Sequence, residues 1–221
     1  MAKKMKISPE GILERFSYPR NDFGLWNNKL STTQVSDALK SMMNSSWVIK
    51  DVKPLKDEFK IIGKAITVNT SSNDWGTALK AIDVAEKGDV LIINSSNDDN
   101  AVWGELTSKT AQKKGLSGTI IYGAVRDKNA IKNMNYPVFT RSLIPNAGEP
   151  LGEGTINVPL NCGGVNINPQ DVIIGDDCGV IVVPAEIFPK VMKKTLQIKN
   201  TEREIIQKIE DGWPLSKIIG L

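Results

Sequence analysis

A strand, helix, strand succession in the middle of the chain limits the fold more than any other feature of the sequence. Apolar runs of strand length occupy residues 89–94 and 118–125, and a helical pattern over residues 102–114 separates them. Gly115 closes that pattern, where a glycine C-cap is expected. Strands alternating with helices are typical of proteins whose helices cover a largely buried sheet. We therefore predict an α/β fold.

Further segments extend this pattern along the chain. Helices are expected over residues 8–16, after Ser31, over residues 77–86, and over about 25 residues from Ala185 to Gly212. Strands are expected over residues 60–68, 165–167, 172–174 and 179–183, whereas Pro and Gly make residues 142–155 a loop. The second half is poor in helix, so we expect a second, antiparallel sheet there.

We expect a single domain over residues 1–221, with an N-terminal arm at residues 1–32 and a C-terminal helical arm at residues 185–221. The net charge of +3, from 28 basic and 25 acidic residues, is too balanced to indicate a nucleic-acid or membrane partner. No apolar segment follows the basic start, and the apolar runs are far shorter than the ~20 residues of a spanning helix. We predict a cytoplasmic protein.

The chain has no histidine, and this absence excludes several kinds of catalysis. Histidine is the usual general base near neutral pH and the commonest ligand of transition metals. A Ser-His-Asp triad, a Cys-His pair and a histidine zinc site are therefore impossible within one chain, and two cysteines cannot form a zinc site. Carboxylates, Lys, Arg, Tyr, Cys, backbone amides and a hard cation held by oxygen remain.

Two candidate groups stand 20 residues apart. Gly104 and Glu105 lie where a polar turn enters a helix, and the free N–H groups of a helix start favour a small anion. Arg126 and Asp127 end an apolar strand; Arg binds carboxylates through two hydrogen bonds, and Asp can hold Mg²⁺. Because one helix and one strand separate the two groups, they can meet at one edge of the sheet. Taken alone, each is also explained by a plain helix start or a solvated surface pair.

Glu202 is a third candidate. It falls between Ile198, Ile205 and Ile209 on the long C-terminal helix, at spacings that place all four on one face. A carboxylate on a packing face is costly unless it is paired or bound to a cation. The alternative is a narrow apolar stripe that leaves Glu202 at its solvated edge.

Other kinds of site have less support in the sequence. The turns at residues 161–164 and 175–179 are better explained as tight β-turns than as a phosphate nest or a calcium loop. No GxGxxG motif follows a strand, so a nucleotide or adenosylmethionine site is not indicated. A lysine that forms a Schiff base stays open as an alternative.

Several motifs, in their order along the chain, resemble the blocks of the RraA-like family from about Thr33 to the C-terminus. The blocks are residues 88–93, Gly104-Glu105-Leu106, residues 118–127, Pro137-Val138-Phe139, Gly163-Gly164-Val165 and residues 175–184. The most specific element is an acid, then 20 residues, then Arg-Asp. The family includes class II 4-hydroxy-4-methyl-2-oxoglutarate aldolases, which also decarboxylate oxaloacetate, and regulators of ribonuclease E activity.

The resemblance implies a fold, an assembly and a metal site. The fold would be a swivelling β/β/α three-layer sandwich, assembled as trimers or hexamers with sites between subunits. Asp127 would bind Mg²⁺ or Mn²⁺, and the C-terminal helix would deliver Glu202 to the metal of the neighbouring subunit.

The resemblance also implies roles for residues around the metal. Arg126 would bind the keto oxygen of the substrate and stabilise an enolate. Glu105 would orient a water used in proton transfer. Gly104 and the backbone amides of Leu106 and Thr107 would hold the pyruvyl carboxylate.

The implied activity is that of a metal-dependent lyase that cleaves a C–C bond of a small 2-keto acid through a pyruvate enolate. The reaction would be the retro-aldol cleavage of 4-hydroxy-2-oxo acids, the decarboxylation of oxaloacetate, or both. The alternative is a non-catalytic regulator that binds a ribonuclease or helicase, although the short regulators lack the long C-terminal helix. Two positions depart from the family pattern: most aldolases have Asp where Glu105 stands, and many have an acid where Ala130 stands.

Overall fold

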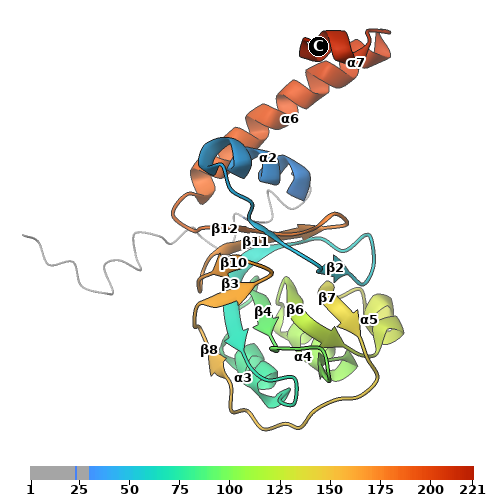
Figure 1. Ribbon diagram of the computed structural model, residues 1–221. Helices are drawn as coiled ribbons and strands as arrows, with labels where there is room; N and C mark the ends of the chain where they lie inside the picture. Colours follow the sequence, from blue (N-terminus) through green and yellow to red (C-terminus); the bar gives the residue numbers. More distant parts are fainter. Residues whose placement is uncertain (1–22, 24–29) are drawn as a thin grey trace, which may run out of the picture.

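The computed structural model describes Phe23 and residues 30–221 (Figure 1). The helix predicted over residues 8–16 and most of the predicted N-terminal arm lie outside the described residues. Within them, a curled sheet carries helices on its faces, and a long C-terminal helix leads away from it.

In the described part of the chain, ten strands form one sheet and two more form a separate hairpin. The order along the sheet is β1-β12-β11-β3-β4-β6-β7-β2, with β5 beside β6 and β8 beside β3. Its strands are β1 (Val48–Ile49), β2 (Lys53–Pro54), β3 (Ile61–Asn69), β4 (Val90–Asn94), β5 (Ala101–Trp103), β6 (Gly118–Val125), β7 (Val138–Leu143), β8 (Thr155–Ile156), β11 (Val172–Asp176) and β12 (Gly179–Val183). The hairpin consists of β9 (Leu160–Cys162) and β10 (Val165–Ile167).

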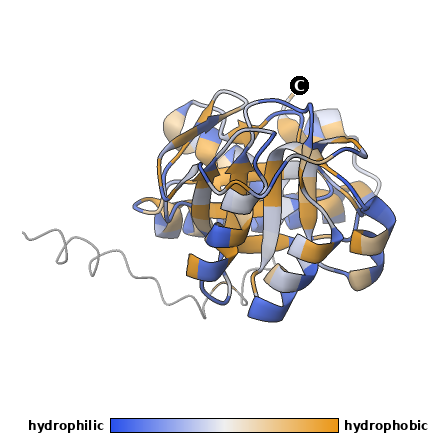
Figure 2. Ribbon diagram, turned by 90° about the horizontal axis from the view of Figure 1, so that it is seen from below, coloured by the Kyte–Doolittle hydropathy of each residue, from blue (hydrophilic) through white to orange (hydrophobic). Residues whose placement is uncertain are grey.

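The centre of the sheet is parallel, because β3 pairs with β4, β4 with β6, and β6 with β7. The helices that accompany these strands are α3 (Gly76–Val84), α4 (Glu105–Lys114) and α5 (Lys128–Met134). Ile92, Ile93 and Ile120 are fully buried in the centre, and the central strands are mostly orange in Figure 2, whereas the surrounding helices show blue outer faces. The predicted α/β class is confirmed.

The other half of the sheet is antiparallel. β11 pairs with β12 and β12 with β1, and β11 also pairs with β3. The predicted antiparallel sheet therefore exists as a continuation of the parallel part through β3, and the whole sheet curls into two β layers (Figure 1). With the helices beside the parallel strands, this is the expected β/β/α sandwich. On the far side of the antiparallel strands, α2 (Thr32–Met43) and α6 (Phe188–Glu210) pack together through Val35, Leu39 and Val191.

A local sequence signal predicts the start of one helix correctly and the start of another wrongly. α2 begins after Ser31, as predicted: Ser31 Oγ accepts a hydrogen bond from Gln34 N, and Gln34 Oε1 accepts one from Ser31 N, each at 3.3 Å. The predicted start of α4 at residue 102 is wrong, because Ala101–Trp103 forms β5 beside β6. Pairing with a distant strand overrides the helical pattern there.

The C-terminal arm consists of α6 and α7 (Leu215–Ile219). One face of the first turns of α6 is buried, through Phe188, Val191 and Met192, whereas Ile206, Trp213 and Ile219 are more than half exposed. No helix within residues 30–221 combines the length and the apolar composition of a transmembrane span. That the arm and the sheet belong to one domain stays a prediction.

Candidate functional site

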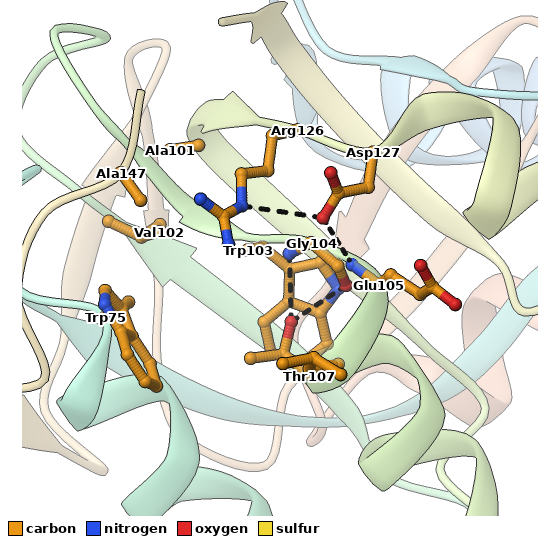
Figure 3. A pocket seen from close by; sticks show the side chains of 11 residues that line it. Trp75, Ala101, Val102, Trp103, Gly104, Glu105, Thr107, Arg126, Asp127 and Ala147 are labelled. Atoms are coloured by element: carbon orange, nitrogen blue, oxygen red, sulfur yellow. Dashed lines mark hydrogen bonds and ion pairs between the residues drawn. The ribbon is translucent and has the colours of Figure 1, made fainter. Parts of the chain in front are cut away.

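A pocket of about 80 Å³, partly open to solvent, lies where β5 and β6 end and where α4 and α5 begin (Figure 3). Its lining residues are Trp75, residues 101–107, Arg126, Asp127 and Ala147. β5 and β6 run parallel, and Trp103 pairs with Val125. The next residues of the two strands therefore emerge side by side, and the structure brings Glu105 and Arg126 to one edge of the sheet.

Asp127 is held by its backbone and by one carboxylate oxygen. It adopts the left-handed conformation, with φ 60° and ψ 34°, as the N-cap of α5. Asp tolerates this region better than most residues do. Its Oδ2 accepts a hydrogen bond from Glu105 N at 3.1 Å and lies 3.5 Å from Arg126 Nε. Within the described residues, Oδ1 has no protein partner, so this oxygen is available to a ligand.

Gly104 permits this arrangement because it lacks a side chain. Its φ of −164° is extended backbone, which any residue can adopt. A Cβ at this position would lie 2.6 Å from Asp127 Oδ2 and 3.1 Å from Arg126 Cγ. A Cβ at position 104 would therefore force the Asp127 carboxylate to shift from its present place.

The start of α4 presents free backbone N–H groups to the pocket. Thr107 Oγ1 accepts a hydrogen bond from Gly104 N and donates one to Gly104 O, both at 3.0 Å. Ser108 N donates to Gly104 O at 3.1 Å. In the part of the chain that the structure describes, no acceptor contacts the N–H groups of Leu106 and Thr107. They lie at the positive end of a helix dipole and can bind an anion.

The side chains of Arg126 and Glu105 differ in whether they face the pocket. The Arg126 side chain is 43% exposed, and its guanidinium points into the pocket (Figure 3). The Glu105 carboxylate pairs instead with Lys109 Nζ at 2.6 Å along the exposed face of α4. An exposed pair of this kind contributes only about 0.3–0.5 kcal/mol. Glu105 can therefore exchange Lys109 for a water or a ligand at little cost.

Glu202 is not part of this pocket within a single chain. It is half-buried on α6, in the arm that leads away from the sheet (Figure 1). Gln34 Nε2 of α2 donates a hydrogen bond to Glu202 Oε2 at 2.5 Å. Glu202 is therefore neither fully buried nor without a partner in the described structure. Its predicted role toward a neighbouring subunit stays a prediction.

Sequence reasoning missed the wall of the pocket that faces Arg126, which consists mainly of Trp75, Ala101 and Ala147. Trp75 stands immediately before α3, and its Nε1 donates a hydrogen bond to Gly148 O at 3.0 Å. The loop over residues 142–155 thus packs against the start of α3. An Asp-Trp-Gly sequence just before a predicted helix is the signal that could have marked this turn.

Asp74, which is only 2% exposed, anchors that loop to the start of α3. Its carboxylate accepts seven hydrogen bonds in the described structure. The donors are Thr70 Oγ1 (3.1 Å), Gly76 N (2.9 Å), Thr77 N (3.3 Å), Thr77 Oγ1 (2.6 Å), Gly152 N (2.7 Å), Glu153 N (2.9 Å) and Gly154 N (3.3 Å). Three of the donors are main-chain groups of the loop, so a segment without regular structure is held in place.

Comparison with known proteins identifies similar sequences over most of the chain. The family model described as RraA-like, Aldolase/RraA, matches residues 32–182. An uncharacterized protein of Methanocaldococcus jannaschii is 40% identical over 176 residues, which cover 78% of this chain and 85% of that protein. A protein of Halalkalibacterium halodurans with the provisional name 4-hydroxy-4-methyl-2-oxoglutarate aldolase is 36% identical over 193 residues, which cover 85% of this chain and 90% of that protein.

Solved structures share the fold. The crystal structure of an uncharacterized protein from Pseudomonas syringae pv. tomato has a TM-score of 0.76 at 28% identity, and the match covers 86% of this chain and 92% of that chain. The RNA-processing inhibitor RraA from Thermus thermophilis has a TM-score of 0.61 at 20% identity, with 67% of this chain and 92% of that chain covered. The second similarity is evidence for the fold alone.

Proposed function

Because the chain belongs to the RraA-like family, we propose that it is a divalent-metal-dependent lyase that cleaves the C3–C4 bond of a 2-keto acid. The substrates would be 4-hydroxy-2-oxo acids, cleaved by a retro-aldol reaction, or oxaloacetate, which would lose CO₂. The observation that carries this proposal is the convergence of Arg126, Asp127 and the free N–H groups of α4 on one pocket.

The residues present fit a hard cation such as Mg²⁺ or Mn²⁺. The donor would be Asp127, which keeps Oδ1 free of protein partners within the described residues while Glu105 N holds Oδ2. Mg²⁺ retains several waters and is commonly held by one or two carboxylates together with the substrate. When bound, the cation would supply Lewis-acid polarisation of the substrate's keto group. Glu202 of the partner subunit would approach it in a trimer or hexamer.

The chain's own groups would act on both ends of the reacting bond. The N–H groups of Leu106 and Thr107 would bind the C1 carboxylate of the substrate. The guanidinium of Arg126 would donate hydrogen bonds to the keto oxygen, where negative charge develops as the electron pair of the C3–C4 bond moves into the enolate. As the aldehyde or ketone forms, the C4 hydroxyl would pass its proton to a water held by Glu105. The same water would then give a proton to C3, which completes pyruvate and restores the water.

The test is pyruvate release from oxaloacetate and a series of 4-hydroxy-2-oxo acids. We expect turnover with Mg²⁺ or Mn²⁺, loss of turnover on addition of a chelator, and recovery when the ion is returned in excess. Absence of release above the uncatalysed rate, or activity that a chelator leaves unchanged, would contradict the proposal. Inactivation by borohydride in the presence of pyruvate would indicate a lysine Schiff base instead.

Replacing Gly104 with alanine should lower kcat/KM for pyruvate release by about 10- to 100-fold, because a 1 Å misplacement of reacting groups can cost that much. The added Cβ, 2.6 Å from Asp127 Oδ2, would displace the carboxylate. Lys113→Ala on the exposed face of the same helix is the control, and it should retain activity. Wild-type kinetics in Gly104→Ala would show that the position of Asp127 does not matter.

The second candidate function is that of a non-catalytic regulator, because the family model that matches residues 32–182 is described as Aldolase/RraA. The match to the Thermus RraA protein leaves about a third of this chain uncovered, and the long α6 is the arm that the short regulators are expected to lack. Stable copurification of a ribonuclease or helicase with a protein that shows no turnover would support this alternative.

A further inference from the structure

The pocket has two ends of different chemistry. At one end lie Arg126, Asp127 and the start of α4 (Figure 3). The opposite wall presents the indole of Trp75, the methyl groups of Ala101 and Ala147, and Val102. Pockets for small molecules commonly combine an apolar wall with a few polar groups that fix the orientation of the ligand.

In the proposed reaction, the C1 carboxylate and the keto group of the substrate occupy all the polar groups at this end of the pocket. The C1 carboxylate and the keto oxygen would occupy the N–H groups of α4 and the guanidinium of Arg126. In the described lining, Arg126 is the single cationic side chain, and it stands against two acids, Glu105 and Asp127. The part of the substrate beyond C3 therefore meets the apolar wall.

Three further cations, Lys109, Lys80 and Arg141, lie outside the lining of the pocket. Lys109 pairs with Glu105 at 2.6 Å on the outer face of α4. Lys80 Nζ donates a hydrogen bond to Gly152 O at 2.7 Å. Arg141 forms a bidentate pair with Asp98, with N–O distances of 2.7–3.1 Å. None of these three lines the pocket in the described structure, and a second carboxylate at the wall would lose its hydration without gaining a counter-charge.

The apolar wall is also fixed in place. Trp75 donates two hydrogen bonds to the loop, from Nε1 to Gly148 O at 3.0 Å and from N to Glu149 O at 3.1 Å. Ala101 N donates to Asn146 O at 2.9 Å. The wall therefore does not depend on a mobile side chain, and the small side chains at positions 101 and 147 leave room in front of the indole.

We infer that the preferred substrates are 4-hydroxy-2-oxo acids with an apolar group, alkyl or aryl, on C4 in place of a second carboxylate. This inference rests on the proposed function and specifies which aldehyde or ketone the reaction would release, namely one that carries an apolar group. Trp75 and Ala147 are the residues that determine this specificity, through the apolar surface and the space that they provide.

The test compares two substrates that differ only at this position: 4-hydroxy-2-oxopentanoate, with a methyl group on C4, and 4-hydroxy-2-oxoglutarate, with a carboxylate there. We expect kcat/KM for pyruvate release to favour the methyl substrate by at least about 10-fold in the wild-type protein. In Ala147→Lys, which places a cation on the wall, the preference should reverse. Ala147→Met adds similar length without charge, so it should slow both substrates and leave their order unchanged.

The outcomes separate this inference from the function on which it rests. A wild-type preference for 4-hydroxy-2-oxoglutarate would overturn the inference while the lyase activity stands, and so would an unchanged ratio in a folded Ala147→Lys protein. The folding of both variants is checked by their Tm. Pyruvate release from neither substrate, nor from oxaloacetate, would contradict the proposed function itself.

Discussion

Replacing Asp127 with asparagine should lower kcat/KM for metal-dependent pyruvate release by at least about 100-fold, which corresponds to about 2.7 kcal/mol of transition-state stabilisation. Asparagine has the same size, tolerates the left-handed backbone of this position, and keeps an oxygen that can accept the hydrogen bond from Glu105 N. The variant thus removes the charge and leaves the local fold. The measurement is the dependence of kcat/KM on Mg²⁺ or Mn²⁺ concentration.

Asp51 offers a matched control for that substitution. It is also an exposed aspartate with a positive φ, 63°, and it does not line the pocket. Asp51→Asn should therefore keep wild-type kinetics and Tm. If Asp127→Asn retained full metal-dependent turnover, Asp127 could not be the ligand of the cation.

Replacing Asp74 with asparagine should lower the free energy of unfolding by about 3 kcal/mol or more, and Tm by roughly 6–12 °C. The amide would direct an N–H₂ group at the N–H groups of Glu153 and Gly154, which cannot accept a hydrogen bond, and the hydroxyls of Thr70 and Thr77 would lose their charged acceptor. Thermal and urea unfolding measure the effect. Asp57→Asn, at an exposed turn, is the control and should unfold like the wild type.

The effect of Asp74 should depend on pH in a definite direction. Burial alone raises the pKa of Asp74, but hydrogen bonds from Thr77, Gly152, Glu153 and Thr70 outweigh it and hold that pKa well below its usual range. The unfolded-state pKa is about 3.9. The stabilisation by the carboxylate is thus fully present well above that pH and is lost as the pH falls toward the folded-state pKa.

The difference in unfolding free energy between wild type and Asp74→Asn should therefore stay constant near neutral pH and shrink below about pH 4. Thr77→Val, which removes one donor hydroxyl, should cost about 1 kcal/mol at pH 7. A difference that grows on acidification would show that the buried carboxylate is protonated in the native state.

Elements with a strong local pattern were predictable, and those that depend on distant partners were not. The strand at Gly118–Val125 lies where its apolar run predicted it, and Ser31 caps α2 as expected. α5 has one buried residue, Ile131, so it carries no apolar periodicity to recognise. The place of β3 between β4 and β11 depends on a pairing with residues more than 100 positions away, which no local pattern specifies.

In the site, too, the parts that depend on local sequence were predictable and the parts that depend on distant contacts were not. The meeting of Glu105 with Arg126 follows from one crossover, and local succession predicts such a unit. The wall with Trp75 and Ala147 depends on contacts between a helix start and a loop some 70 residues later in the chain. Hydrogen bonds to main-chain groups of that loop leave little trace in the identity of its residues.

Because the loop is attached through its main chain, the side chains that line the pocket can change during evolution. Asp74 holds the loop through the N–H groups of Gly152, Glu153 and Gly154, and Trp75 holds it through the carbonyls of Gly148 and Glu149. The side chains at Ala147, Leu151 and Glu153 take no part in this anchoring. Of these positions Ala147 lines the pocket. A substitution there can therefore reshape the wall while the path of the loop is preserved, so one scaffold could acquire a new leaving-group preference without first losing its stability.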